Sequence, residues 1–249
     1  MHEKGRHPVA VLWTSLIAVA LGVSLVCSVP LRASEGIRDQ GSGISRLTPD
    51  TQSLTPETPQ GVTTNQAVQR LDLTPALFVE NQGQWTDRAV RYVHDGNPVD
   101  VALRESGILF QVGTRPLQFS ASFVGAKTVC PVGLQRSHAV FNYCLGNQAG
   151  WRTGVTSYEE VVYPGLYEGI DLHVWGLRSR LKYEFHVAPG ADYRRIAVRY
   201  EGIEGLSIRE DGSLAVNLRE QQDVIRDDAP YIYQEIDGRK VELAGQFVL

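Results

Sequence analysis

Short runs of alternating apolar and polar residues, separated by turn-forming residues, fill the chain from about Leu73 onward. Every second residue of Leu117–Phe123 is apolar, and Ile196–Tyr200 repeats the pattern. A two-residue period is typical of a strand with one face buried and the other in water. No segment beyond Leu73 keeps a 3.6-residue period over three turns. We therefore expect an all-β fold of antiparallel strands, arranged as a two-sheet β-sandwich-like domain.

Two Asp-Gly pairs mark the turns of predicted hairpins. One lies between Leu206–Ile208 and Leu214–Leu218, and the other between Tyr231–Ile236 and Arg239–Leu243. Glycine adopts the positive φ that a tight hairpin turn requires, so this dipeptide between alternating runs is a strong hairpin signal. The 24 Gly and 12 Pro of the chain fit a fold with many such turns.

We expect residues 1–34 to be an export leader. A short basic start precedes Val9–Val29, which is almost wholly apolar, and this order is typical of a signal peptide. The run is also long enough to cross a bilayer as an uncleaved anchor, and lipid attachment at Cys27 is a third alternative. All three predict a secreted or cell-surface protein, with membrane contact only through Val9–Val29 if the leader stays.

The leader is followed by two segments of different composition. Residues 35–72 are rich in Thr, Pro, Ser and Gln and bury too little apolar surface to offset the entropy of ordering, so we expect a disordered linker. Residues 73–249 form the predicted β domain. The formal net charge of −4 and the pI near 5.9 give no basic surface for nucleic acid.

The chain has none of the short motifs that accompany common catalytic or nucleotide-binding sites. It lacks the G-x-S-x-G elbow, the H-E-x-x-H zinc motif, the phosphate-binding P-loop and the dinucleotide fingerprint. We therefore expect a protein that is not an enzyme and has no cofactor. A glycosidase that uses two carboxylates leaves no such motif and stays open as an alternative.

Cys130 and Cys144 lie in the predicted domain. An even pair of cysteines in an oxidising compartment favours a disulfide, and closing the loop between them contributes about 3 kcal/mol. Two free thiols are the alternative. The spacing matches no redox or zinc motif.

Ile170–Val187 carries the densest set of chemically active side chains. If its two halves pair as a hairpin, matching their apolar faces sets the register. The predicted opposite pairs are Asp171 with His186, His173 with Glu184, and Trp175 with Lys182. Two histidines and two carboxylates on one face are candidate ligands for a divalent metal. The plainer interpretation, which we adopt, is a solvated face of cross-strand ion pairs and a cation–π contact.

Tryptophans beside carboxylates raise a carbohydrate hypothesis. Glu80–Trp85 is a polar run that ends in tryptophan, and an exposed tryptophan stacks well on a sugar face. The simpler interpretation is a turn whose amides satisfy the backbone while Trp85 packs into the core. The candidate sugar-contacting residues are Glu80, Trp85, Trp151 and Trp175, with Glu159 as a further carboxylate.

Several short motifs occur in a shared order along the domain, from Phe78–Trp85 through Trp151–Thr153 and Tyr163–Leu172 to Pro230–Ile236 and Gly245–Leu249. Together they resemble an uncharacterised bacterial N-terminal β-rich domain that precedes beta-propeller (SBBP) repeats in exported and cell-surface proteins. The resemblance implies an exported β-rich module of unknown activity and supplies no catalytic residues. Positions 173 and 186 are usually apolar or aromatic in that family, so the two histidines set this chain apart.

The expected function is therefore a non-catalytic exported module with a structural, adhesive or interaction role. Its expected partners are other protein modules or cell-surface components. The alternative is a carbohydrate-binding or carbohydrate-cleaving extracellular domain, which requires an exposed tryptophan in a groove beside carboxylates.

Overall fold

The computed structural model describes most of the domain and one short segment of the leader. For residues 11–18 and 221–224 the backbone alone is described. The rest of the predicted leader and the whole predicted linker, residues 35–72, lie outside the described residues. The described ranges are 11–18, 74–96, 99–112, 117–144, 146–177, 180–219, 221–236 and 239–249.

Strands make up nearly all of the regular structure, and the described residues contain no α-helix, so the all-β expectation is confirmed. Two short 3₁₀ turns are η1 (Gln148–Gly150) and η2 (Tyr193–Arg195). The strands are β1 (Val11–Ala18), β2 (Phe78–Glu80), β3 (Val90–His94), β4 (Val99–Arg104), β5 (Gly107–Val112), β6 (Leu117–Phe123), β7 (Val132–Tyr143), β8 (Arg152–Tyr167), β9 (Ile170–Leu177), β10 (Arg180–Val187), β11 (Val198–Glu201), β12 (Gly205–Ile208), β13 (Leu214–Leu218), β14 (Gln221–Asp227), β15 (Tyr231–Ile236) and β16 (Arg239–Leu243).

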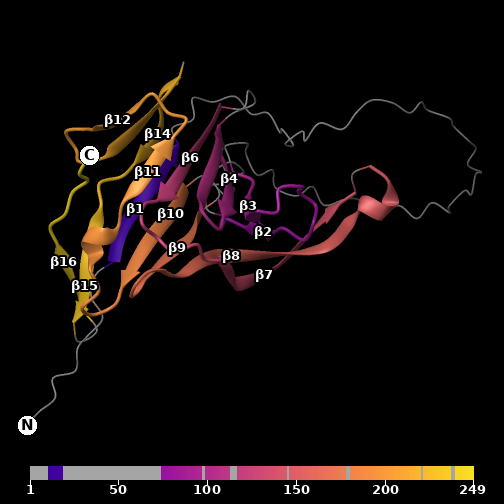
Figure 1. Cartoon of the computed structure of the whole chain (residues 1–249), viewed down its shortest axis with the longest axis horizontal. Coiled ribbons are helices and arrows are strands. Elements are labelled where there is room, and N and C mark those ends of the chain that lie inside the picture. The colour runs from indigo at the N-terminus through magenta and orange to yellow at the C-terminus, as the bar shows by residue number, and fades with distance from the viewer. Residues whose placement is uncertain are drawn as a thin grey trace, which may run out of the picture.

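All of these strands belong to one antiparallel sheet. Its main path runs β11-β6-β5-β4-β3-β2-β8-β9-β10-β1-β14-β13-β12, with β7 on β8, and β15 and β16 beside β1. The sheet curls instead of dividing into the two packed sheets that we predicted (Figure 1). Strand twist and the register shifts in β3, β7, β8 and β13 let one sheet enclose a core. The alternating pattern is the same for either architecture, so it did not distinguish them.

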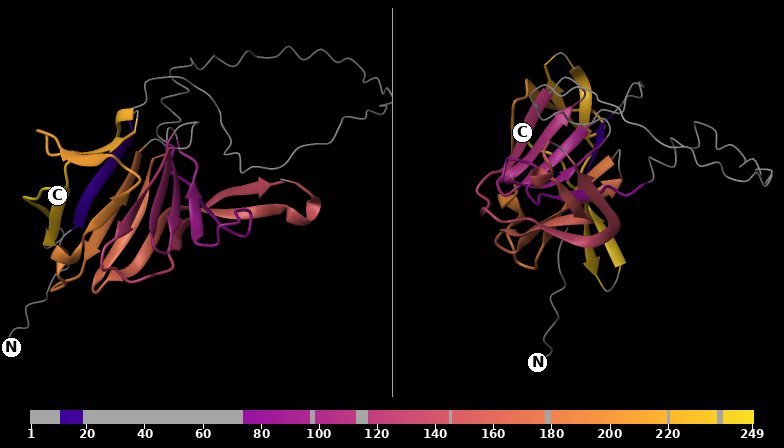
Figure 2. Two further views of the ribbon diagram at one scale, coloured as in Figure 1. Left: turned by 45° about the horizontal axis from the view of Figure 1, so that its top comes forward. Right: turned by 90° about the vertical axis from the view of Figure 1, so that its right-hand side faces the viewer.

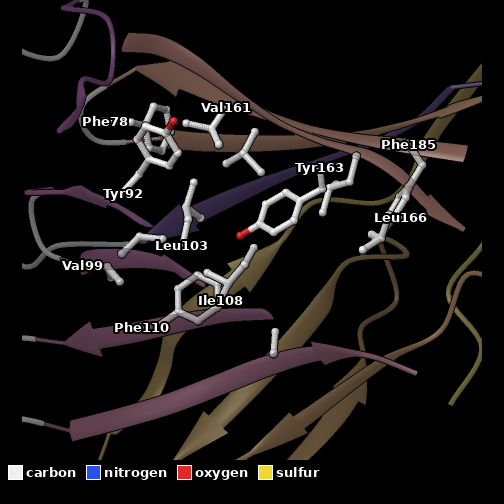
Figure 3. Packing of buried hydrophobic residues seen from close by; sticks show 14 of the residues in the cluster. Phe78, Tyr92, Val99, Leu103, Ile108, Phe110, Val161, Tyr163, Leu166 and Phe185 are labelled. Carbon is white, nitrogen blue, oxygen red and sulfur yellow. The ribbon is translucent and has the colours of Figure 1, made fainter. Parts of the chain in front are cut away.

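The core lies inside the curl of the sheet. Phe123 on β6 contacts Tyr163 on β8 and Phe185 on β10, with ring centroids 6.0 and 6.3 Å apart. Because β6 and β10 are far apart in the strand order, these contacts require the sheet to fold back on itself. Figure 3 shows labelled members of this apolar cluster, among them Tyr163, Leu166 and Phe185, gathered between the strands.

The predicted hairpins have the predicted strands. β12 and β13 pair around Gly212, whose φ is +81°, with Ile208 opposite Leu214. β15 and β16 pair with Ile236 opposite Arg239, although the turn residues 237–238 lie outside the described residues. Local turn chemistry was therefore a good guide to neighbouring strands.

β7 and β8 extend beyond the body of the sheet as a two-stranded ribbon that ends at η1 (Figures 1 and 2). β8 continues into the body, where it pairs with β2 and β9, whereas among the described strands β7 pairs with β8 alone. We call the paired part of β7 and β8 the β7–β8 ribbon. Most of the β7 side chains are exposed.

β1 lies within the segment that we assigned to the leader. It is hydrogen-bonded between β10 on one side and β14 and β15 on the other, all antiparallel to it. In Figure 1 it is the indigo strand among the orange and yellow strands. Among the residues that the structure describes, no helix is long and apolar enough to span a membrane.

Candidate functional site

β9 and β10 pair in the register that the sequence predicted. Asp171 lies opposite His186, His173 opposite Glu184, and Trp175 opposite Lys182. The apolar residues of β9 at 170, 172 and 174 are buried, so these polar residues share the outer face of the hairpin. Face matching determined this register because a one-residue slip would have turned the buried residues outward.

The side chains on this face form two local pairs. The Nδ1 atom of His173 lies 2.5 Å from Oε1 of Glu160, a residue of β8. The Nε2 atom of His186 lies 3.4 Å from Oε1 of Glu184. The two imidazole rings stack, with centroids 3.8 Å apart and planes 19° apart. Each histidine is thus directed to a carboxylate of its own.

Asp171 and Lys182 complete the predicted set. Oδ1 of Asp171 accepts a hydrogen bond from the backbone amide of Gly165, at 2.5 Å, and so belongs to the neighbouring bend of β8. The Nζ atom of Lys182 lies 5.1 Å from the centroid of the Trp175 ring, as the cation–π hypothesis predicts. Burial and the nearby Arg180 lower the pKa of Lys182.

No three His, Cys, Asp or Glu side chains in the described part of the chain are placed to hold one metal ion. Of the four weak metal candidates, His173 and His186 lie together, Glu184 contacts His186, and Asp171 points to the β8 bend. Of the plainer interpretation, the structure has the Trp175–Lys182 contact, whereas the histidines pair with Glu160 and Glu184 in place of the predicted cross-strand partners, and both carboxylates are largely buried and not solvated.

A pocket of about 430 Å³ opens beside these pairs, where the base of β7 meets β8, β9 and β10. The pocket is lined by three carboxylates, a half-buried tryptophan ring, an imidazole and a side-chain amide, together with apolar residues. The polar and aromatic lining side chains are Glu159, Glu160, Glu184, Trp175, His186 and Gln135. The structure thus brings together two members of the carbohydrate hypothesis, Trp175 and Glu159, which are far apart in the sequence.

Glu184 is almost completely buried, with 7% of its surface exposed. Its carboxylate accepts a hydrogen bond from the hydroxyl of Tyr233 on β15, at 3.2 Å, and also contacts His186. The Nζ atom of Lys240 lies 4.1 Å above the ring of Tyr233. These contacts hold the buried carboxyl group in one position and satisfy its hydrogen-bonding oxygen.

Sequence reasoning missed Glu160 and Tyr233 as members of this face. Glu160 lies opposite Trp175 in the β8–β9 pairing. Its Oε2 atom accepts a hydrogen bond from Nε2 of Gln135 on β7, at 3.0 Å. The alternation along β8 was a usable signal for Glu160, because it places that side chain on one face. No local signal connects Tyr233 to Glu184, since β15 reaches β10 only across β1.

The Glu80–Trp85 run forms a turn whose polar groups bond to one another and to the ribbon. Asn81 donates through Nδ2 to the backbone oxygen of Val90, at 2.9 Å, and accepts from the amide of Gly83. The Glu80 carboxylate accepts from Thr156 on β8, at 2.8 Å. The amide-rich turn that we expected is therefore present. Trp85, however, packs edge-on against Tyr143 of the ribbon, 5.4 Å away, and not in the core.

The remaining carbohydrate candidates are dispersed along the ribbon. Trp151 follows η1 at the far end, where it is 40% exposed and donates to the backbone oxygen of Gly146 at 3.4 Å. Neither Trp85 nor Trp151 lines the pocket with Trp175. The four candidates therefore do not form a single groove.

The predicted Cys130–Cys144 disulfide is not present in the structure. Both cysteines are free and exposed. They lie just beyond the two ends of β7, a strand of 12 residues. The register shifts of β7 leave some of its residues outside the ladder, so at about 3.3 Å per paired residue the strand holds its ends roughly 30 Å apart, far beyond the reach of a disulfide. Sequence separation was a poor guide because the intervening residues form one extended strand and not a loop.

Fold and site define a class, which is an all-β domain with one curled antiparallel sheet, a projecting ribbon, and a pocket near the base of that ribbon that is lined by both polar and apolar side chains. The chain belongs to the family described as "Domain of unknown function (DUF7948)", which matches residues 78–249. The matched region contains every strand named above except β1. No curated protein and no solved structure matches the chain.

Proposed function

We propose that this protein is a non-catalytic exported module with a structural or adhesive role, and that the β7–β8 ribbon is its main contact surface. The leader composition supports export to the cell surface or to the medium. The ordered motifs that resemble a bacterial domain preceding beta-propeller (SBBP) repeats support the same class. Its partners are other protein modules or cell-surface components.

The observation that carries this proposal is the exposed apolar surface of the ribbon. Val132, Leu134 and Val140 on β7 are 48%, 41% and 54% exposed, and Trp151 beyond η1 is 40% exposed. A strand that pairs on one side only also leaves backbone groups available for another chain. Exposed apolar side chains along a projecting element are typical of a protein interface.

Site-specific photo-crosslinking on producing cells tests this proposal. A photoreactive residue at Leu134 should crosslink to a defined protein, and the additional change Val140→Lys should abolish the crosslink. The matched control places the same photoreactive residue at Ile208 on β12, which is 42% exposed on another part of the sheet. Equal crosslinking from both positions, or no loss with Val140→Lys, would contradict the role of the ribbon.

A carbohydrate-binding role is the second candidate, and the pocket favours it. Trp175 supplies an aromatic face, and Glu159, Glu160 and Gln135 supply hydrogen-bonding groups around it, which is the composition of a sugar subsite. A glycan array probed with the full chain should then give saturable binding that Trp175→Ala removes and Trp151→Ala preserves. Binding that depends on Trp151 and not on Trp175 would place the sugar on the ribbon.

A further inference from the structure

β1 lies between two groups of described strands that do not pair with each other, so it fills a channel between them. One wall is β10, which pairs with β1 over seven residues, from Val11 opposite His186 to Ile17 opposite Arg180. The other wall consists of two strands, β15 and β14, which pair with successive parts of β1. Val11–Trp13 pairs with β15, and Leu16–Ala18 pairs with β14. We call the space between these walls the strand channel.

The strand channel separates the sheet into two parts. Among the described strands, β12 to β16 are joined to the remainder by strand pairing only through β1. Because β1 is antiparallel to both walls, β10 runs in the same direction as β14 and β15. Removing β1 would leave two rows of backbone amide and carbonyl groups without strand partners, which is the condition that favours addition of a strand.

Side chains from the two walls meet across the strand channel, on both sides of β1. The hydroxyl of Tyr183 on β10 donates to Asp227 on β14. The hydroxyl of Tyr233 on β15 donates to Glu184 on β10, at 3.2 Å. Because Tyr183 and Glu184 are consecutive, their side chains point to opposite faces of the sheet. One hydrogen bond therefore connects the walls on each face.

The two walls and β1 come from different segments of the chain. The family match covers residues 78–249 and so includes both walls, while β1 lies outside it. β1 is also separated from Thr74, where the described domain begins, by residues 19–73. In this chain the residues that the family match covers therefore form every strand of the sheet but one, and a segment with the composition of an export leader supplies that strand.

The inner surface of the strand channel is apolar except for the buried hydrogen bond between Tyr183 and Asp227. Phe185 on β10 and Ile225 on β14 are 1% and 0% exposed, and Tyr183 adds an aromatic ring on the same face. A segment that enters must therefore carry apolar side chains at alternate positions and a free backbone amide at the paired ones. The sequence of β1, VLWTSLIA, is such a segment.

We propose that the strand channel is an acceptor site for an extended apolar segment of a second polypeptide, which joins the sheet antiparallel to β10, and that Val11–Ala18 occupies it in cis. This inference rests on the proposed function, because it names a partner class for an exported interaction module. The recognition is by backbone hydrogen bonds along the strand, with specificity from the alternate apolar positions. Departure of the leader makes the channel available to the partner.

A strand-exchange experiment tests the proposal on the folded full chain. A protease site is inserted between Gln60 and Gly61, and the purified protein is cut after folding. The probe is a fluorescent synthetic peptide of residues 10–19 with lysines added at both ends. We expect the peptide to displace the leader fragment and to bind saturably. The same peptide with Thr14→Pro and Leu16→Pro should bind at least about tenfold more weakly, because proline removes strand amides.

Three results would overturn the proposal. The two peptides could bind equally, which would indicate adsorption to an apolar surface. The leader fragment could leave and no peptide enter a domain that stays folded. The fragment could also resist any excess of peptide, which would make β1 a permanent strand. The ribbon variant Val140→Lys should leave peptide binding unchanged, so failure of the ribbon proposal and failure of this one are distinguishable.

Cysteine crosslinking in the uncut chain checks the register without relying on the cleaved protein. In a background with the native cysteines changed to serine, Ser15→Cys with Lys182→Cys should form a disulfide, because opposite strand residues have suitable separations. Ser15→Cys with Arg180→Cys is the matched control, two residues out of register. A disulfide in both variants, or in neither, would show that β1 does not hold the described position.

Discussion

The aromatic ring of Tyr158 lies directly against Gly133, so that a Cβ atom at position 133 would be 2.4 Å from the ring. The backbone amide of Gly133 also donates to the hydroxyl of Tyr92, at 2.9 Å. Tyr92 and Tyr158 meet edge to face with ring centroids 5.7 Å apart. This three-residue contact joins the base of β7 to the body of the sheet.

We expect Gly133→Ala to destabilise the protein by about 1–3 kcal/mol, because the added methyl group must displace an aromatic ring in a packed contact. Urea unfolding followed by tryptophan fluorescence measures the change. The matched control is Gly205→Ala, where the added Cβ meets no atom within 4 Å. A Gly133→Ala protein as stable as the Gly205→Ala protein would show that the contact is not tightly packed.

The buried carboxylate of Asp227 provides a second prediction. It is 0% exposed and accepts a hydrogen bond from Tyr183, so Tyr183→Phe removes a donor from a buried charge. Loss of such a bond typically costs about 1–3 kcal/mol. Thermal unfolding should show the loss, whereas Tyr193→Phe at an exposed position should have no effect. Equal melting temperatures for the two variants would contradict the assigned bond.

Asp100 predicts a pH dependence of stability. Burial, and secondarily the carboxylate of Asp95, raises the pKa of Asp100 from 3.8 to about 6. The folded protein therefore binds this proton before the unfolded chain does as the pH falls. By proton linkage, the contribution of Asp100 to stability increases as the pH falls from above 6 toward 3.8, and the ionised form is a cost at higher pH.

Asp100→Asn should remove that cost. The Asn side chain keeps an oxygen to accept from the amide of Gly96, as Asp100 does at 3.2 Å, and it carries no charge. We expect a gain of about 1 kcal/mol at pH 8, reduced from the full linkage value because the carboxylate is partly exposed to solvent. Below pH 4 the two proteins should have equal stability. Urea unfolding across this pH range measures the difference, and a constant difference at every pH would contradict the assignment.

The two domain cysteines provide a fourth prediction. Because they lie at opposite ends of β7 and are exposed, both should react with a thiol reagent in the native, air-oxidised protein. Intact-mass analysis after labelling counts the modified thiols, and peptide mapping assigns them. Detection of a linked Cys130–Cys144 peptide from native monomer would require β7 to be shorter than described.

Several features of the fold could be predicted from local sequence. The alternation in Leu117–Phe123 indicated β6 at its observed bounds, and the Asp-Gly pair at 211–212 indicated the β12–β13 hairpin. The register of β9 and β10 followed from matching apolar faces. In each case the interacting residues are close in the chain, so turn geometry and side-chain period together leave one arrangement.

Part of the candidate site could be predicted in the same way. The Trp175–Lys182 contact and the outer face that carries His173 and His186 follow from the hairpin register alone. The pairing of His173 with Glu160 did not, because β8 pairs with β9 through a register shift that the sequence pattern does not reveal. The pocket also depends on the pairing of β7 with β8, and the local sequence pattern did not predict that pairing.

The sequence by itself determined strands such as β6, β12 and β13 and the side of β9 and β10 that faces the core, because these depend on the two-residue period and on turn residues. Only the tertiary structure decided which strand edges meet: one curled sheet in place of two, the separation of Cys130 from Cys144, and β1 between β10 and β14. The physical reason is that backbone hydrogen bonds are the same for every pair of strands. The choice among distant edges is made by twist, bulges and the packing of the whole core.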